Sequence, residues 1–219
     1  MAVPKLSLEL APGSRLGTLA ISEMIGSDLF DSIIVVVREQ DGLLWIPEPS
    51  RRSNGEAEAE IRIVPCAEAS RGMSFSLREG LKEALALQPD AVMIVLADQP
   101  FITSRLLSSL IASYKNEPDS DFVACAGRSN AMPPVLFSPS MFSALSGLEG
   151  DAGARKLLAS PAYRGVLVEV ASETMFTDVD TPFDLQEARR HWSETKGKGG
   201  HSDESDDFGG NEPNMQAIR

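Results

Sequence analysis

Cysteine and histidine are scarce in this sequence of 219 residues, and their positions exclude several kinds of catalysis. The two cysteines, Cys66 and Cys125, lie 59 residues apart. Neither a CxxC metal motif nor a disulfide framework is indicated, and a reducing cytoplasmic setting is expected. The two histidines, His191 and His201, fall at the end of the last expected helix and beyond it. Nucleophilic systems that pair a serine or cysteine with a histidine base are therefore not expected.

Positive charge and long apolar runs are also in short supply. Lysine and arginine total 20 against 32 aspartates and glutamates, which gives a net charge of −12. A chain this acidic repels a polyanion, so a nucleic-acid partner is not expected. No apolar run approaches the ~20 residues that a membrane span needs, and the first residues lack the charged and apolar regions of a secretory signal. We therefore expect a cytoplasmic protein without a membrane partner.

Two glycine-rich nucleotide motifs, GxGxxG after a strand and GxxxxGK[ST], are absent as well. The composition changes near Ser193, after which glycine, serine and acidic residues dominate. Residues 194–219 cannot bury enough apolar surface to offset the entropy of ordering, which predicts a disordered acidic tail. Residues 1–193 are long enough for one domain with its own core.

Within residues 1–193, short apolar runs alternate with amphipathic segments. The runs expected to form strands are 32–38, 61–64, 91–97, 122–126, 135–137 and 166–170. The segments expected to form helices are 14–29, 74–87, 103–114, 140–145, 152–158 and 181–192. This alternation predicts an α/β fold, a doubly wound and mostly parallel sheet with helices on both faces. Ligands of such sheets bind at the carboxyl ends of the strands.

The segment AVMIVLADQP at 91–100 places Asp98 at the end of an expected buried strand. A carboxylate in this position commonly holds Mg²⁺ against phosphates. Asp98 could equally cap the turn before the helix that is expected from Thr103. Both interpretations stay open on the residues alone.

A second acidic strand end occurs in FTDVDTPFDL at 176–185. Asp178 and Asp180 are two residues apart, so in an extended segment both carboxylates point to one face. Pro182 suits the first turn of a helix, and an ordinary helix start with a capping residue is the alternative to metal binding. Two strand ends that carry aspartate favour the metal, because a nucleotide-bound Mg²⁺ prefers two carboxylates.

Two further segments offer groups that suit anions. RGMSFSLREG at 71–80 puts a glycine and serines at a helix entry, where N–H groups would be free to meet an anion or a base edge; a simple N-cap by Ser74 is the alternative. GDAGAR at 150–155 opens another helix, with Asp151 complementing the helix dipole and Arg155 available for phosphate. A solvated turn with a surface arginine would have the same sequence.

Five motifs together, in this order and spacing, resemble the MobA-like nucleotidyltransferases. They are GMSFSLREG at 72–80, LADQP at 96–100, PPVLF at 133–137, GDAGAR at 150–155 and DVDTPFDL at 178–185. Within that family the chain, from Pro4 to about Arg190, looks most like the molybdenum cofactor cytidylyltransferase and purine-catabolism accessory branch. The resemblance implies a Rossmann-like nucleotidyltransferase fold. It also implies transfer of CMP from CTP, or from another NTP, to the phosphate of a molybdopterin cofactor, with release of pyrophosphate.

The resemblance also implies roles for individual residues. Asp98 and Asp180 match the family's two Mg²⁺-binding aspartates, and Lys5 matches a lysine that contacts phosphate and acts in catalysis with Asp98. The residues expected beside the base and ribose are Gly72, Ser74 and Ser76. The residues expected to border the cofactor pocket are Pro133, Pro134, Gly150, Asp151 and Arg155.

The sequence departs from the family pattern at its start. The family has an apolar strand and a loop of the form LAAGxSxRMG before the matching lysine, whereas this sequence begins MAVPKL. That loop supplies backbone N–H groups for the triphosphate. In the family that strand is central and lies between the strands that match 33–37 and 92–96, so the resemblance implies a gap in the sheet here. We expect either that the true start lies upstream, or that these two strands close on each other and catalysis is lost.

Two alternatives to the cytidylyltransferase remain. A non-catalytic accessory protein could keep the pterin pocket and deliver the cofactor to a molybdenum hydroxylase such as xanthine dehydrogenase. The absent loop favours this alternative, and the retained Asp98 and Asp180 favour the enzyme. A sugar-phosphate nucleotidyltransferase would share the fold, but the GDAGAR segment counts against it by resemblance.

Overall fold

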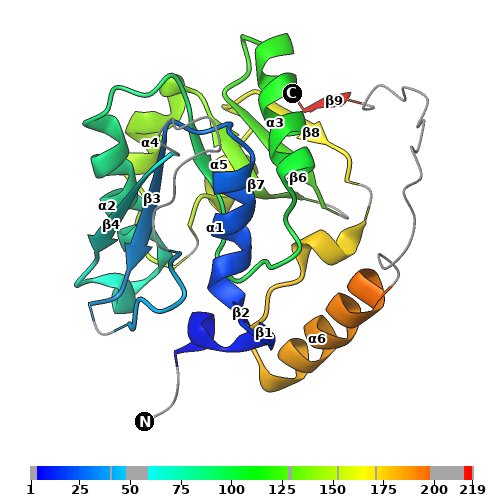
Figure 1. Cartoon of the computed structure of the whole chain (residues 1–219). Helices are drawn as coiled ribbons and strands as arrows, with labels where there is room; N and C mark the ends of the chain where they lie inside the picture. Colours follow the sequence, from blue (N-terminus) through cyan, green and yellow to red (C-terminus); the bar gives the residue numbers. More distant parts are fainter. Residues whose placement is uncertain are drawn as a thin grey trace.

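The computed structural model describes residues 4–39, 41–47, 59–127, 130–151, 153–170, 172–197 and 215–218. Within these residues no helix combines the length and the apolar character that crossing a bilayer would require. Figure 1 shows a pair of strands at one side, a larger sheet at the other, and helix α1 in front of them.

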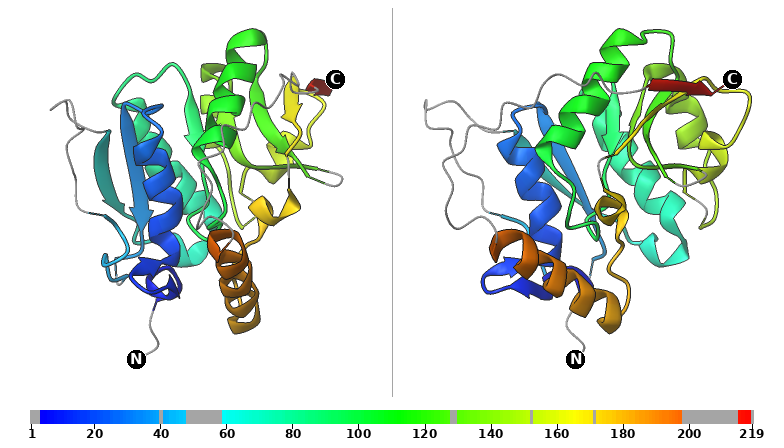
Figure 2. Two further views of the ribbon diagram at one scale, coloured as in Figure 1. Left: turned by 45° about the vertical axis from the view of Figure 1, so that its right-hand side comes forward. Right: turned by 90° about the vertical axis from the view of Figure 1, so that its right-hand side faces the viewer.

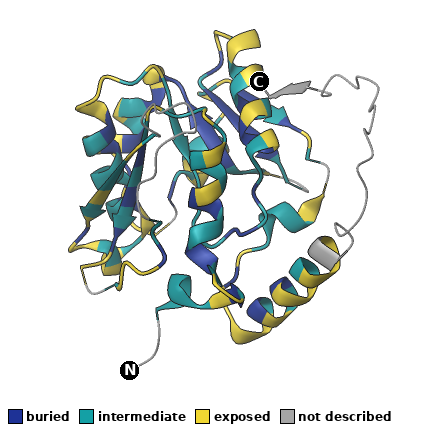
Figure 3. Ribbon diagram, viewed as in Figure 1, coloured by how far each residue is buried: buried dark blue, intermediate teal, exposed yellow. Residues whose placement is uncertain are grey.

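The strands are short and follow the apolar runs of the sequence. They are β1 Glu9–Ala11, β2 Ser14–Arg15, β3 Ser32–Val37, β4 Glu60–Pro65, β5 Val92–Ile94, β6 Phe122–Ala126, β7 Ala131–Phe137, β8 Gly165–Val168 and β9 Met215–Ile218. In β3 the buried residues alternate with half-buried ones, as expected for a strand with a core on one face. In β6 four successive residues are buried, because helices or loops cover both of its faces (Figure 3).

The helices occupy the segments between the strands. The α-helices are α1 Leu16–Gly26, α2 Met73–Leu85, α3 Ser104–Asn116, α4 Phe142–Ser146, α5 Arg155–Leu158 and α6 Pro182–Gly197. The 3₁₀ turns are η1 Lys5–Ser7, η2 Ala69–Arg71, η3 Pro139–Met141 and η4 Glu173–Phe176. Thr103 caps α3, because its side chain accepts a hydrogen bond from the Leu106 N–H at 3.3 Å.

The predicted α/β class is confirmed, and the sheet topology adds detail to it. β3 pairs with β4 in parallel. A second sheet has the order β5-β7-β6-β8-β9, in which β5, β6 and β8 share one direction and β7 and β9 run the opposite way. In the described part of the chain no ladder joins β3 to β5. Direct closure of these two strands, one of the alternatives from the sequence, is therefore not observed.

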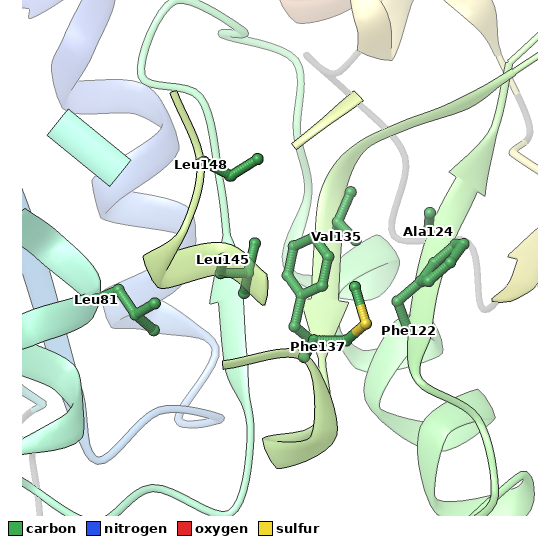
Figure 4. Packing of buried hydrophobic residues seen from close by; sticks show 8 residues of the cluster. Leu81, Phe122, Ala124, Val135, Phe137, Leu145 and Leu148 are labelled. Carbon is green, nitrogen blue, oxygen red and sulfur yellow. The ribbon is translucent and has the colours of Figure 1, made fainter. Parts of the chain in front are cut away.

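Side-chain packing rather than a ladder connects the two sheets. One cluster groups Ile33, Val35 and Val37 of β3 with the buried Trp45, and Ala97 packs against it. A second cluster lies between α2 and the larger sheet. Figure 4 shows Phe137 and Phe122 on adjacent strands, with leucines of α2 and α4 facing them. These clusters hold the end of β5, where Asp98 follows, in a fixed position relative to β3.

The N-terminal segment packs against α6, which lies beside it in the turned views (Figure 2). Leu10 and Leu16 form a buried cluster with Val179 and with Leu185 of α6. The Arg189 guanidinium of α6 also donates to the backbone oxygen of Glu9 at 2.6 and 3.0 Å. This packing brings the first residues next to the segment that carries Asp178 and Asp180.

Two elements extend into residues 194–219, the stretch that the sequence predicts as a disordered tail. Helix α6 continues to Gly197, because Glu194 and Lys196 are good helix formers. Residues 215–218 form β9, which pairs with the edge of β8 that would otherwise lack a neighbour. Residues 198–214 and 219 lie outside the described residues.

Candidate functional site

Three residues that are far apart in the sequence meet at one point. The Lys5 Nζ donates to Asp98 Oδ2 at 2.8 Å and to Asp180 Oδ1 at 2.7 Å. The two carboxylate oxygens are therefore at most 5.5 Å apart, the sum of those distances. The structure thus brings together the predicted lysine and the two predicted metal aspartates, at the carboxyl end of β5.

The backbone fixes each member of this cluster. Lys5 opens η1, whose turn is closed by hydrogen bonds from Ser7 N to Pro4 O and from Leu8 N to Lys5 O. The Val179 N–H donates to the backbone oxygen of Asp98 at 3.1 Å, which joins the turn after β5 to the segment before α6. Asp98 and Asp180 therefore lie on two stretches of backbone that are bonded to each other.

The capping interpretation fails for Asp180, because other residues cap α6. Asp184 Oδ2 accepts hydrogen bonds from the N–H groups of Asp180 and Thr181 at 3.1 and 2.7 Å. In return, the Asp184 N–H donates to Thr181 Oγ1 at 3.2 Å, which completes a capping box. The hydrogen bonds from the Thr181 hydroxyl and N–H lower the pKa of Asp184. The carboxylate of Asp180 is left for Lys5.

Asp98 lies in the turn that it was expected to cap, but among the described residues its carboxylate accepts a hydrogen bond from Lys5 and from no N–H of that turn. Helix α3 is capped by Thr103, and its Ser104 N–H donates to Glu23 Oε2 of α1 at 2.7 Å. Asp98 is instead part-buried, with its side chain 24% exposed, and it contacts Lys5.

A third carboxylate, Asp178, borders the cluster. The buried Gln99 donates its Nε2 hydrogen to Asp178 Oδ1 at 2.9 Å. Although Asp178 is exposed as a residue, its carboxyl group lies against Gln99 and loses part of its hydration. This desolvation raises the pKa of Asp178, and the negative charges of Asp98 and Asp180 raise it further, against the opposing effects of Gln99 and Lys5.

The charges in this cluster do not balance. Burial lowers the pKa of Lys5, but the hydrogen bonds and charges of Asp180 and Asp98 outweigh it and leave the pKa raised, so that the ammonium stays protonated. Three carboxylates against one ammonium leave an excess negative charge, which attracts a cation. Among the described residues, no three His, Cys, Asp or Glu side chains are grouped closely enough to hold a metal ion.

The segments predicted for the nucleotide and for the cofactor pocket touch each other. Ser74 of α2 donates to the Gly150 oxygen through Oγ at 2.6 Å and through its N–H at 3.3 Å. The Met73 N–H donates to Asp151 Oδ1 at 3.2 Å. We call these contacts the Gly72–Gly150 junction. The expectation that the first N–H groups of α2 are free for an anion is therefore wrong, because the loop at Gly150 and Asp151 already binds them.

Gly72 is required at this junction. Its φ of 135° and ψ of 162° lie in a region that only glycine adopts readily. A Cβ at this position would lie 2.7 Å from the Gly150 oxygen. Ser74 is fully buried, so it holds two segments together rather than presenting its hydroxyl at a surface.

The remaining predicted residues lie close to these two clusters. Ser76 is half-buried in α2, and Arg155 is exposed at the start of α5. Pro133 and Pro134 lie in β7, where Val135 is opposite Ile94 of β5. Because these strands are antiparallel, the two prolines border the stretch of chain that leads from β5 to Asp98.

A cavity of about 490 Å³ lies beside the junction. It is lined by Arg71, Phe75, Arg78, Glu149 and Gly150. The guanidinium carbons of Arg71 and Arg78 lie 4.5 and 4.7 Å from the centroid of the Phe75 ring. Arg71 also pairs with Glu68, whereas Arg78 has no ion pair among the described residues.

Comparisons with known proteins show the family to which the chain belongs. The family model described as a MobA-like NTP transferase domain matches residues 1–170. The chain belongs to this family. The purine catabolism protein PucB of Bacillus subtilis (strain 168) is 32% identical over 195 residues, which cover 88% of this chain and 91% of that protein. Phosphoenolpyruvate guanylyltransferase of Sphaerobacter thermophilus is 30% identical over 202 residues and 87% of each chain.

Solved structures share the fold of this MobA-like domain. The crystal structure of the homologue of Mycobacterium tuberculosis rv0371c from Mycobacterium sp. strain JC1 superposes with a TM-score of 0.68 at 24% identity. The match covers 88% of this chain and 90% of that one. The predicted family and fold are thereby confirmed, and the protein is a nucleotidyltransferase by family.

The sequence did not predict the contacts of three side chains near the site of the MobA-like domain, those of Gln99, Asp178 and Arg78. Gln99 follows Asp98 directly, and its position beside a predicted ligand was the only local signal for it. Asp178 was recognised as facing the same way as Asp180, but nothing in the sequence placed it against Gln99. Arg78 lies in the second turn of α2, and an arginine there is compatible with any solvated helix face.

Proposed function

We propose that this MobA-like protein transfers CMP from CTP to the phosphate of a molybdopterin cofactor and releases pyrophosphate. The contact of Lys5 with both Asp98 and Asp180 is the observation that supports this most strongly. It groups one phosphate-binding cation with two oxygen ligands at the carboxyl end of β5, where ligands of α/β sheets bind. The group contains no serine, threonine, cysteine or histidine, and the proposed transfer needs no covalent nucleophile.

The donor set fits a hard divalent cation. Asp98 and Asp180 offer oxygen ligands only, and they already share one cation, the Lys5 ammonium. Mg²⁺ held there would neutralise the negative charge that develops on the triphosphate. Lys5 binds phosphate oxygens as a point charge, and Gln99 and Asp178 keep the end of β5 in register with the segment before α6.

The reaction needs no covalent enzyme intermediate. An oxygen of the acceptor's phosphate attacks the α-phosphorus of CTP in line, and the bond between that phosphorus and the oxygen bridging to the β-phosphate breaks. Pyrophosphate leaves with the bond's electron pair, and a new phosphoanhydride joins CMP to the cofactor. The residues contribute position and charge, the two effects on which phosphoryl transfer chiefly depends.

The cavity beside the Gly72–Gly150 junction suits the acceptor. Its Arg78 guanidinium lacks an acidic partner among the described residues, although the chain as a whole carries a net charge of −12. A guanidinium that stacks on an aromatic ring can still donate two parallel hydrogen bonds to a phosphate. The predicted border of the cofactor pocket at Gly150 lines the same cavity.

The test is a pyrophosphate-release assay with molybdopterin and Mg²⁺, run separately with CTP, GTP, ATP and UTP. We expect release with CTP, and loss of at least about a hundredfold in Asp98→Asn because a ligand of the metal is gone. Asp119→Asn is the matched control, since the Asp119 side chain is 88% exposed and precedes β6, whereas Asp98 follows β5, which runs in the same direction. Phosphoenolpyruvate is tested as a second acceptor, because a relative is named as its guanylyltransferase.

An accessory role is the second candidate, supported by the name of the relative PucB, a purine catabolism protein. It predicts tight binding of molybdopterin and transfer to a molybdenum hydroxylase, without pyrophosphate release from any nucleotide. Release with GTP alone would keep the reaction and change the base. Absence of release with all four nucleotides and both acceptors would contradict the proposed enzyme.

A further inference from the structure

The ammonium of Lys5 lies where a metal ion shared by Asp98 and Asp180 would lie. It contacts one oxygen of each carboxylate, at 2.8 and 2.7 Å. A divalent cation that used the same two oxygens would bond to them at ~2.1 Å and would leave no room for the ammonium between them. Among the described residues, no other lysine or arginine pairs with either carboxylate.

We propose that Lys5 and the divalent cation exchange at this pair of carboxylates. In the metal-free protein the Lys5 ammonium offsets part of the negative charge of Asp98 and Asp180 and holds the two carboxylates together. When the cation binds, the ammonium is displaced, and Lys5 then binds the phosphates of the nucleotide. The inference rests on the proposed function, in which Asp98 and Asp180 are the metal ligands.

The local structure permits this movement of the lysine. Lys5 is the first residue of η1, and its side chain is 36% exposed, so that its flexible stem can turn toward solvent. The backbone need not move, because η1 and the following strand are packed through Leu6, Leu8 and Leu10 against α1 and α6. The carboxylates stay in place as well, since the hydrogen bond from Val179 N to Asp98 O joins their segments.

The exchange gives Lys5 opposite effects on two ligands. Removing the ammonium removes the competitor of the metal, so metal alone should bind more tightly. The same change removes a positive charge from the phosphates, so the nucleotide should bind less tightly. A lysine whose single role is to contact phosphate would lower nucleotide affinity and leave the affinity for metal alone unchanged.

The test measures Mn²⁺ binding without nucleotide, by the electron paramagnetic resonance signal of the free ion. We expect Lys5→Met to bind Mn²⁺ about tenfold more tightly, the size expected when two partly exposed ion pairs no longer compete. Lys82→Met is the matched control, because the Lys82 side chain is 80% exposed and only approaches Glu79, at 3.9 Å. Mn²⁺ affinity of Lys5→Met equal to or weaker than that of the unaltered protein would overturn the proposal.

A second measurement follows the released lysine directly. The protein is treated with an acetylating reagent, with and without saturating Mg²⁺, and acetylation of Lys5 and Lys82 is quantified by peptide mass spectrometry. Mg²⁺ should speed acetylation of Lys5 and leave Lys82 unchanged. A rate at Lys5 that does not respond to Mg²⁺ would show that the ammonium stays in place and would also overturn the exchange.

The proposed function and the exchange fail in different ways. If Asp98→Asn does not weaken Mn²⁺ binding, the two aspartates are not the metal site, and both fall. If Asp98→Asn weakens binding but Lys5→Met does not strengthen it, the metal site stands and the exchange alone is refuted.

Discussion

The Lys5 cluster and the Gly72–Gly150 junction use their polar groups in opposite ways. In the Lys5 cluster, one ammonium pairs with two carboxylates and a third carboxylate, that of Asp178, borders them, so negative charge is left over. At the junction, the hydroxyl and N–H of Ser74 and the N–H of Met73 all have protein partners. Unbalanced charge indicates a site for a ligand, and a closed set of hydrogen bonds indicates structural support. The sequence had assigned both regions to ligand binding.

The sharpest way to break this comparison is Gly72→Ala. We expect a loss of about 3 kcal/mol in the free energy of unfolding, because alanine is strained at this φ and ψ and its Cβ would meet the Gly150 oxygen. Denaturant unfolding measures it. Gly26→Ala is the control, since a Cβ there meets nothing within 4 Å and the residue ends helix α1. If Gly72→Ala unfolds like the unaltered protein, the junction does not support the fold.

Ser74→Ala should follow with a loss of about 1.5 kcal/mol, the cost of a buried hydrogen bond, without a change in the KM for nucleotide. Ser76→Ala is matched to it, because Ser76 lies half-buried two residues along the same helix. It should leave stability nearly unchanged, and a raised KM would support its predicted place beside the nucleotide. A raised KM in Ser74→Ala with normal stability would reverse our assignment of the junction.

Arg78→Gln tests whether the cavity beside the junction binds a ligand, as we infer for the Lys5 cluster. We expect the KM for the molybdopterin acceptor to rise about fivefold, since a charge-assisted hydrogen bond is replaced by a neutral one. The KM for CTP should stay the same. Lys82→Gln, on the same helix but 80% exposed, is the control. An equal effect of the two substitutions would mean that Arg78 acts only through the overall charge.

The Lys5 cluster could be anticipated from the sequence because its signals are local. An apolar run that leads to Asp98, and an acidic pair before Pro182, both indicate the carboxyl edge of a sheet. Its lysine came from the family resemblance alone, since Lys5 has no pattern around it. The caps at Thr103 and Thr181 were equally accessible, because a cap depends on residues within one turn of its helix.

The features that escaped prediction depend on contacts between distant segments. Gln99 meets Asp178 across 79 residues, and Glu23 binds the start of α3 across 81. No local sequence pattern around either partner indicates these hydrogen bonds. The junction was misjudged for the same reason: the N–H groups at a helix start look free until the loop that binds them is placed.

The smallest expected effect concerns Asp178, and its sign distinguishes the Lys5 cluster from an ordinary cap. Partial desolvation and the charges of Asp98 and Asp180 raise the pKa of Asp178, so ionising it in the folded protein opposes folding. This cost exists above the folded pKa and disappears below the unfolded pKa of about 3.9, where both states are protonated. Asp178→Asn should therefore raise the Tm slightly at pH 7 and have no effect near pH 3.

The pKa of Asp184 shifts in the opposite direction, since hydrogen bonds from Thr181 lower it. Its carboxylate stabilises the fold at neutral pH and ceases to do so as the pH falls through the lowered value, so Asp184→Asn should lower the Tm at pH 7. Thermal unfolding across pH 3–8 measures the Tm of both variants. A Tm at pH 7 that falls in both would show that the Asp178 carboxylate stabilises the fold, as the Asp184 carboxylate does.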